Sequence, residues 1–302
     1  MNAVTKLGAF ALALGVVFGA TYGAGRLAGP GVPPTPAAGE HATEEHGTTA
    51  TEPPTAPGGL QVSERGYTME TVAAPAGQFG FRITGPNGKP VTAFDVAHDK
   101  RMHLIVARRD LSGFRHVHPE MAADGTWRVA SPLGEPGSWR AFADFTPTGG
   151  AGITLGTDVH VPGAFAPRPL PAPATTTTID GYAVGLAGTL EPGRTSKLTL
   201  SVSRAGQPVT DLQPYLGAYG HLVALRAGDL AYLHVHPDET NAKPGPEITF
   251  YAEVPSAGAY RLYLDFQHGG TVRTAEFTVV AGGAVIPPAA PDDHGTPGHT
   301  HD

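Results

Sequence analysis

The 302-residue sequence contains no cysteine. This absence excludes disulfide scaffolds, cysteine-ligated zinc ribbons, iron–sulfur clusters and thiol catalysis. Charged residues are also scarce, at 16% of the chain, and the formal net charge is −7. A nucleic-acid-binding protein would carry a clustered surplus of lysine and arginine, so we expect no nucleic-acid partner. The sequence also lacks a Gly-x-Ser-x-Gly elbow, a phosphate-binding loop and a His-Glu-x-x-His motif, and we expect that the protein is not an enzyme.

A long uncharged segment lies close to the N-terminus. Residues 7–25 contain no charged side chain, and Lys6 and Arg26 flank them. A helix of this length spans about 28 Å, roughly the thickness of a bilayer core. We therefore expect residues 1–26 to form a signal anchor that crosses the cell membrane once and places the rest of the chain outside the cytoplasm. Cleavage near residue 24, which would release a secreted protein, is the alternative.

Three further segments are too rich in proline, threonine and alanine to bury a core. Residues 27–59 predict a disordered tether, and residues 282–302 predict a disordered tail that contains histidine. Residues 162–178 include five prolines and four threonines, which is typical of a semi-rigid linker between domains.

The two remaining segments, 60–161 and 179–281, are copies of one another. Gly-Lys-Pro-Val-Thr at 88–92 corresponds to Gly-Gln-Pro-Val-Thr at 206–210, an offset that holds without a gap as far as Pro119 and Pro237. Eleven of these 32 aligned positions are identical. Residues 137–145 then align with 258–266 after a three-residue insertion. The pattern indicates one domain of about 100 residues that has been duplicated.

Each copy is predicted to be all-β. Short segments of alternating or β-branched residues are separated by glycine, proline and aspartate, and no stretch has the helical period. The second copy has seven such segments, which is typical of an immunoglobulin-like β-sandwich. The predicted fold is therefore two tandem immunoglobulin-like sandwiches after an N-terminal transmembrane helix. A small closed barrel is the competing architecture.

The motif His-x12-His-x-His-Pro occurs once in each copy. In the second copy, a turn at Gly228-Asp229 would place His221 opposite His236, with His234 two residues before it on the same face. Opposed Cβ atoms in a hairpin are roughly 5 Å apart, so the three imidazoles could share one metal ion at about 2 Å. The first copy has a poorer turn at 110–111, where a slip of one residue would send His103 to the other face.

These spacings define the candidate metal ligands, which are His103, His116 and His118 in the first copy, His221, His234 and His236 in the second, and His268 as an added ligand. Ligation by imidazole alone favours copper, with zinc close behind. The better turn and His268 predict tighter binding in the second copy, because Arg108 and Arg109 would oppose a cation in the first. A structural polar cluster without metal is the alternative.

The segment 211–223, Asp-Leu-Gln-Pro-Tyr-Leu-Gly-Ala-Tyr-Gly-His-Leu-Val, together with His-Val-His-Pro at 234–237, resembles a known group of proteins. They are membrane-anchored extracytoplasmic proteins of actinobacteria and, more loosely, YtkA-like immunoglobulin-type domains, some of which handle copper or other heavy metals. The resemblance implies a β-sandwich outside the membrane and carries over no catalytic residue. We therefore expect a membrane-tethered protein that buffers or delivers copper or zinc. The alternative is a structural or protein-interaction module of the cell envelope with no metal role.

Overall fold

The computed structural model describes residues 57–233, 235–238 and 242–283. The expected anchor, most of the expected tether and tail, and His234 lie outside these ranges. Within them, every regular element is a strand, and no helix is long and apolar enough to cross a membrane.

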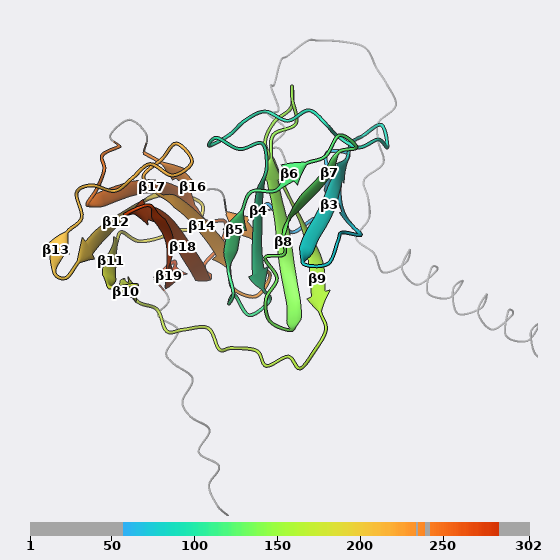
Figure 1. The fold of residues 1–302 in the computed structure, drawn as a ribbon. Coiled ribbons are helices and arrows are strands. Elements are labelled where there is room, and N and C mark those ends of the chain that lie inside the picture. Colours follow the sequence, from blue (N-terminus) through green and yellow to red (C-terminus); the bar gives the residue numbers. More distant parts are fainter. Residues whose placement is uncertain (1–56, 234, 239–241, 284–302) are drawn as a thin grey trace, which may run out of the picture. The chain divides into compact units, whose positions relative to one another are not determined.

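The first repeat is a sandwich of two antiparallel sheets (Figure 1). One sheet has the order β1 (Ser63–Glu64), β2 (Tyr67–Val72), β3 (Gln78–Thr84), β7 (Thr126–Ala130) and β6 (Glu120–Met121). The other has the order β5 (Arg115–Val117), β4 (His103–Arg108), β8 (Gly137–Phe145) and β9 (Ile153–Val161). Large apolar side chains such as Phe81, Trp127 and Leu104 fill the space between the sheets.

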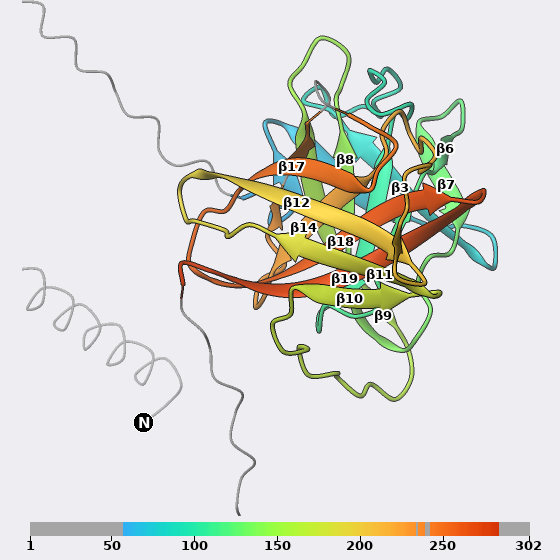
Figure 2. The same cartoon turned by 90° about the vertical axis from the view of Figure 1, so that its left-hand side faces the viewer.

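The second repeat has the same architecture (Figure 2). Its first sheet has the order β10 (Thr176–Ile179), β11 (Tyr182–Ala187), β12 (Thr195–Arg204), β17 (Glu247–Glu253) and β16 (Val235–Pro237), with β13 (Gln207–Pro208) paired to β12. Its second sheet has the order β15 (Tyr232–Leu233), β14 (His221–Arg226), β18 (Gly258–His268) and β19 (Thr271–Ala281). The prediction of an all-β protein with two tandem immunoglobulin-like sandwiches is confirmed.

Strands β4 and β14 are buried on both faces. Because successive side chains on a strand point to opposite faces, Leu104 and Val106 enter the core of the first repeat, while Ile105 and Ala107 face outward. These outward residues pack in one cluster with Val223 of β14. The outer face of each strand is therefore covered by the other repeat.

Eight of the ten buried residues in this cluster form four pairs under the internal alignment, which are Ile105 with Val223, Ala107 with Leu225, Phe114 with Tyr232, and Phe142 with Tyr263. The rings of Phe114 and Tyr263 stack with centroids 4.0 Å apart, and the rings of Phe142 and Tyr232 lie 5.7 Å apart. Each such aromatic pair contributes about 0.5–1.5 kcal/mol beyond its buried area. The two copies thus meet through the same face, as the subunits of a symmetric dimer do.

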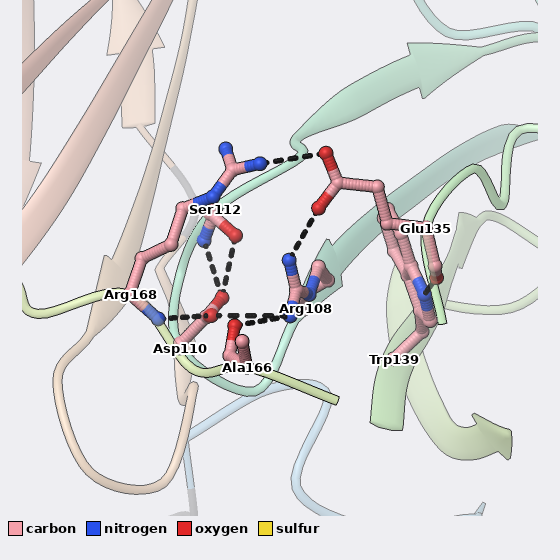
Figure 3. Close-up of polar contacts among 7 residues, drawn as sticks. All are labelled: Arg108, Asp110, Ser112, Glu135, Trp139, Ala166 and Arg168. Carbon is pink, nitrogen blue, oxygen red and sulfur yellow. Dashed lines mark hydrogen bonds and ion pairs between the residues drawn. The ribbon is translucent and has the colours of Figure 1, made fainter. Parts of the chain in front are cut away.

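The segment between the repeats is held against the first one (Figure 3). The Arg108 guanidinium donates to Glu135 at 2.7 Å and to the Ala166 carbonyl at 3.1 Å. Arg168 donates to Glu135 at 2.6 Å through its side chain and to Asp110 at 2.8 Å through its backbone N–H. Residues 176–178, expected at the end of the linker, begin β10.

Candidate metal centre

His103 and His221 begin the equivalent strands β4 and β14, and each follows an equivalent tight turn. The turns are closed by bridges between Ala97 and Lys100 and between Tyr215 and Ala218. Both central residues have positive φ, at 48° for His98 and 61° for Asp99, as a type I′ turn requires. The turn in the second repeat has the same form, with a leucine and a glycine in these two places.

A backbone carbonyl of each turn fixes the proton on the histidine that follows. His103 Nε2 lies 3.0 Å from the Ala97 carbonyl, and His221 Nε2 lies 2.7 Å from the Tyr215 carbonyl. A carbonyl oxygen can only accept a hydrogen bond, so Nε2 is the donor in both rings. In the neutral imidazole the lone pair is then on Nδ1. This orientation by a backbone acceptor is usual for metal-binding histidines.

His116 and His118 are brought to His103 by the register of β5 against β4. Leu104 pairs with Val117 and Ile105 with His116, so one step further places His103 opposite His118, as the spacing predicted. The connection between β4 and β5 therefore does not cause the one-residue shift in register that would have turned His103 to the other face. The ring centroids of the three histidines are 4.8–5.3 Å apart. One ligand atom from each ring lies within 4.8 Å of the other two.

His116 lies between His103 and an aspartate of the other repeat. Its Nδ1 is 3.0 Å from Asp265 Oδ2, and its Nε2 is 3.0 Å from His103 Nδ1. Because a carboxylate accepts, Nδ1 of His116 is the donor, and two lone pairs would then face each other between the rings. This contact is favourable only if a cation is shared there, either a proton or a metal ion.

His118 supplies the third nitrogen. Its Nε2 is buried and has no hydrogen-bond partner in the described part of the chain. Burial, together with the nearby imidazoles of His116 and His103, lowers the pKa of His118 to about 3. Burial is also the main reason why the pKa of His103 is lowered to about 4. Both rings are therefore neutral near pH 7, which is the form that binds metals.

Two aspartates beside the histidines, Asp144 on β8 and Asp265 on β18, each accept a hydrogen bond from the other repeat. Asp265 accepts from His116, and its Oδ1 also accepts from Thr274 at 2.6 Å. Asp144 accepts from Thr154 at 3.0 Å and from the Tyr232 hydroxyl of the second repeat at 3.3 Å. Asp265 thus orients a histidine of the other repeat.

The expected hairpin of the second copy is formed near its turn but does not continue to His236. Ala224 pairs with Leu233 and Leu225 with Tyr232, as the Gly228-Asp229 turn predicts. The next strand, β16, pairs instead with β17 of the opposite sheet, where His236 lies across from Tyr251. The expectation that His236 lies opposite His221 is therefore wrong, because the chain changes sheets between β15 and β16.

A family model described as "Domain of unknown function (DUF8832)" matches residues 59–163 and again residues 176–283. The chain belongs to this family. No curated protein matches its sequence. Among solved structures, domains 4 and 5 of the S-layer protein SbsC are 11% identical, with a TM-score of 0.20 over 48% of this chain and 64% of that one. The chain thus spans less than two thirds of that fragment.

Two other solved structures show comparable values. Invasin, described as a bacterial integrin-binding protein, is 15% identical with a TM-score of 0.20 over 70% of this chain and 39% of that one. The FN1–FN3 domains of chicken CNTN1 are 10% identical with a TM-score of 0.19 over 74% and 68% of the two chains. None of these three descriptions mentions copper.

His268 and the two arginines singled out from the sequence have other partners than the histidine triad of the first DUF8832 copy. His268 has both ring nitrogens engaged, with Nδ1 2.6 Å from the Tyr182 hydroxyl and Nε2 3.0 Å from Asp211. Arg108 is paired with Glu135, and Arg109 with Asp158 at 2.6 Å. The positive charges expected to oppose a cation in the first copy are therefore compensated by carboxylates.

The sequence analysis did not predict that the two DUF8832 copies pack against each other, although the strand sequences indicate it. The runs His-Leu-Ile-Val-Ala-Arg at 103–108 and His-Leu-Val-Ala-Leu-Arg at 221–226 do not alternate between apolar and polar residues. An unbroken apolar strand is buried on both faces. In a two-sheet sandwich this requires a third layer, and the other copy supplies it.

Proposed function

We propose that this protein is a non-catalytic β-sandwich module that binds one divalent transition-metal ion through His103, His116 and His118. The observation that carries the proposal is the convergence of three imidazole nitrogens in a buried place, one of which has no hydrogen-bond partner among the described residues. The outer nitrogens of His103 and His116 are held by acceptors, which aims their lone pairs at each other.

The donor set favours copper(II), with zinc as the close competitor. Imidazole nitrogen suits both ions, and the Irving–Williams order places copper(II) higher. Copper(I) would prefer sulfur, but the side chain of Met102 is buried in the core of the first repeat and Met121 packs against the same core. Buffering or delivering copper outside the cytoplasm, from a membrane anchor at residues 1–26, is the role we propose.

A structural or interaction module without metal is the second candidate. The contact between His116 and Asp265 joins the repeats, as does the Tyr263 hydroxyl, which donates to the Leu111 carbonyl at 2.6 Å. On this view the histidines are a polar part of the interface. The solved structures named above are an S-layer protein, FN domains and an integrin-binding protein, and none is described as metal-binding. Their descriptions agree better with this second candidate than with copper handling.

Calorimetric titration of the full chain with copper(II) and with zinc(II) separates the two candidates. We expect one tight equivalent per chain, and its loss when His103, His116 and His118 are all replaced by alanine. His268→Ala is the matched control, because its ring nitrogens are already engaged. The triple variant also reports any weak binding by histidines near the termini, such as His46 and His299. Equal isotherms for the wild type and the triple variant would favour the second candidate.

Thermal melting gives an independent readout. A metal that binds only the folded state raises stability by about 2.7 kcal/mol at a hundredfold excess over Kd. We expect copper(II) to raise the Tm of the wild type and of His268→Ala, and to leave that of the triple variant unchanged.

A further inference from the structure

A small cavity lies where the histidines of the two repeats meet. Its volume is about 40 Å³, and its lining includes His98, His103 and His116 from the first repeat and His221 from the second. A cavity of roughly 10–15 Å³ already holds one water. This one therefore has room for an ion together with a water molecule.

His221 is oriented in the same way as His103, by a hydrogen bond from Nε2 to a backbone carbonyl. It occupies the equivalent position at the start of β14, it is 9% exposed, and its Nε2 donates to the Tyr215 carbonyl. Its Nδ1 lone pair has no hydrogen-bond partner within the described residues. The ring centroid lies 6.3 Å from that of His116 and 5.3 Å from that of His98.

Charge also favours a cation at this place. Asp144 and Asp265, one from each repeat, lie at the edge of the cluster, and both already accept hydrogen bonds from the opposite repeat. Each of their oxygens accepts a hydrogen bond, so the two carboxylates supply negative potential and orient their neighbours, while the imidazoles supply the ligand atoms. A buried cation is stabilised by such paired carboxylates.

We propose that the ion bound by His103, His116 and His118 lies at the edge of this cavity, and that the ring of His221, which lines the cavity but is not one of the three converging imidazoles, moves toward the ion to complete the coordination. This inference rests on the proposed metal binding. The ion then cross-links the two copies of the domain, and its affinity depends on a residue that the triad in the first repeat does not contain.

Copper(II) titration of the full-length His221→Ala variant tests the proposal. We expect the wild type and the His268→Ala control to bind one ion tightly, and His221→Ala to bind it about tenfold or more weakly. The copper(II) electron paramagnetic resonance spectrum should show one coordinated nitrogen fewer. His221→Gln keeps a donor for the Tyr215 carbonyl, and it is the second variant if the alanine variant does not fold.

The outcomes separate this inference from the proposed function. A wild type that binds no copper(II) overturns both. A wild type that binds tightly, with His221→Ala and His221→Gln unchanged in affinity and spectrum, overturns only the role of His221.

The cross-link has a readout of its own. Residues 171–174 of the linker are exposed, so a protease site placed there allows the folded chain to be cut between the repeats. We expect copper(II) to raise the Tm of the cut, still associated protein, and to raise it less when His221 is replaced by alanine. An equal effect of copper(II) in both proteins would contradict the cross-link.

Discussion

At the scale of single residues, hydrogen-bond acceptors beside the histidines decide which imidazole nitrogens keep a lone pair for a metal ion. Ala97 and Tyr215 each accept the Nε2 proton of a buried histidine, and Asp265 accepts the Nδ1 proton of His116. The lone pairs that remain on His103 and His116 point toward each other. The orientation of the imidazoles is thus set before any ion binds, which reduces the entropy lost on binding.

Replacing Asp265 by asparagine should weaken copper(II) binding about tenfold without abolishing it, since the residue orients His116 and does not need to touch the ion. A competition titration against a chelator of known affinity measures the change. Asp211→Asn is the control, because Asp211 pairs with the unrelated His268. Equal affinities for Asp265→Asn and Asp211→Asn would contradict the orienting role.

The metal-free protein should become less stable as the pH falls from 6.5 toward 4. The pKa values of His103 and His118 are lowered to about 4 and about 3 in the folded state, from 6.5 in the unfolded chain. The unfolded state therefore binds more protons in this window, so the free energy of unfolding rises with pH by up to about 1.4 kcal/mol per pH unit for each ring.

Urea denaturation in the presence of a chelator, at pH 4.5 to 7.5, measures this dependence. The stability contribution is fully present above pH 6.5 and is lost as the pH falls. Replacing His103 and His118 by glutamine should flatten the profile, while replacing the exposed His160 should leave it as in the wild type. A wild-type profile that is already flat would contradict the prediction.

At the scale of elements, β4 and β5 form the hairpin that assembles the triad, and the segment after β9 is fixed by the same repeat. Arg108 is almost fully buried and shares Glu135 with Arg168 of the linker. Phe165 also lies against Arg108, whose guanidinium carbon is 4.9 Å from the ring centroid. A proline-rich segment that would otherwise be a spacer is thereby held in place.

Glu135→Gln should loosen this segment, because it removes the carboxylate that Arg108 and Arg168 share. We expect a loss of about 1–3 kcal/mol of stability and faster proteolytic cleavage within residues 162–175. Glu191→Gln, which removes an exposed ion pair with Arg194, is the control and should change neither. Limited proteolysis followed by mass spectrometry locates the cuts.

The sequence predicts the strands and the histidine spacing well, because both depend on local alternation and on one turn. It placed His103, His116 and His118 on one face, and the register of β5 against β4 agrees. It did not predict the change of sheet after Leu233, because a strand that pairs with β17 has the same alternation as one that pairs with β14. The contact between His116 and Asp265 depends on the packing of whole domains, which no local pattern encodes.

At the scale of the whole described chain, the two sandwiches share one apolar interface. Tyr263 is fully buried there, stacks on Phe114 and donates to the Leu111 carbonyl. The repeats should therefore unfold in one cooperative transition, since neither keeps its outer face covered when the other unfolds.

Tyr263→Ala should cost about 3–5 kcal/mol and separate the unfolding of the two repeats. Tyr263→Phe removes only the hydroxyl and should cost about 1–3 kcal/mol of stability, because the Leu111 carbonyl then has no donor. The ring remains in the interface, so a single transition should be kept. Differential scanning calorimetry distinguishes one transition from two. A single transition in Tyr263→Ala would show that the interface does not couple the repeats.

The shared face has a consequence for how chains meet one another. Because each repeat presents the same cluster to its neighbour, the first repeat of one chain can pair with the second repeat of another, giving a domain-swapped dimer that contains the interface twice. The contacts of Arg108 and Arg168 with Glu135 oppose this exchange by holding the linker along its own first repeat. Glu135 thereby favours pairing of the two repeats within one chain.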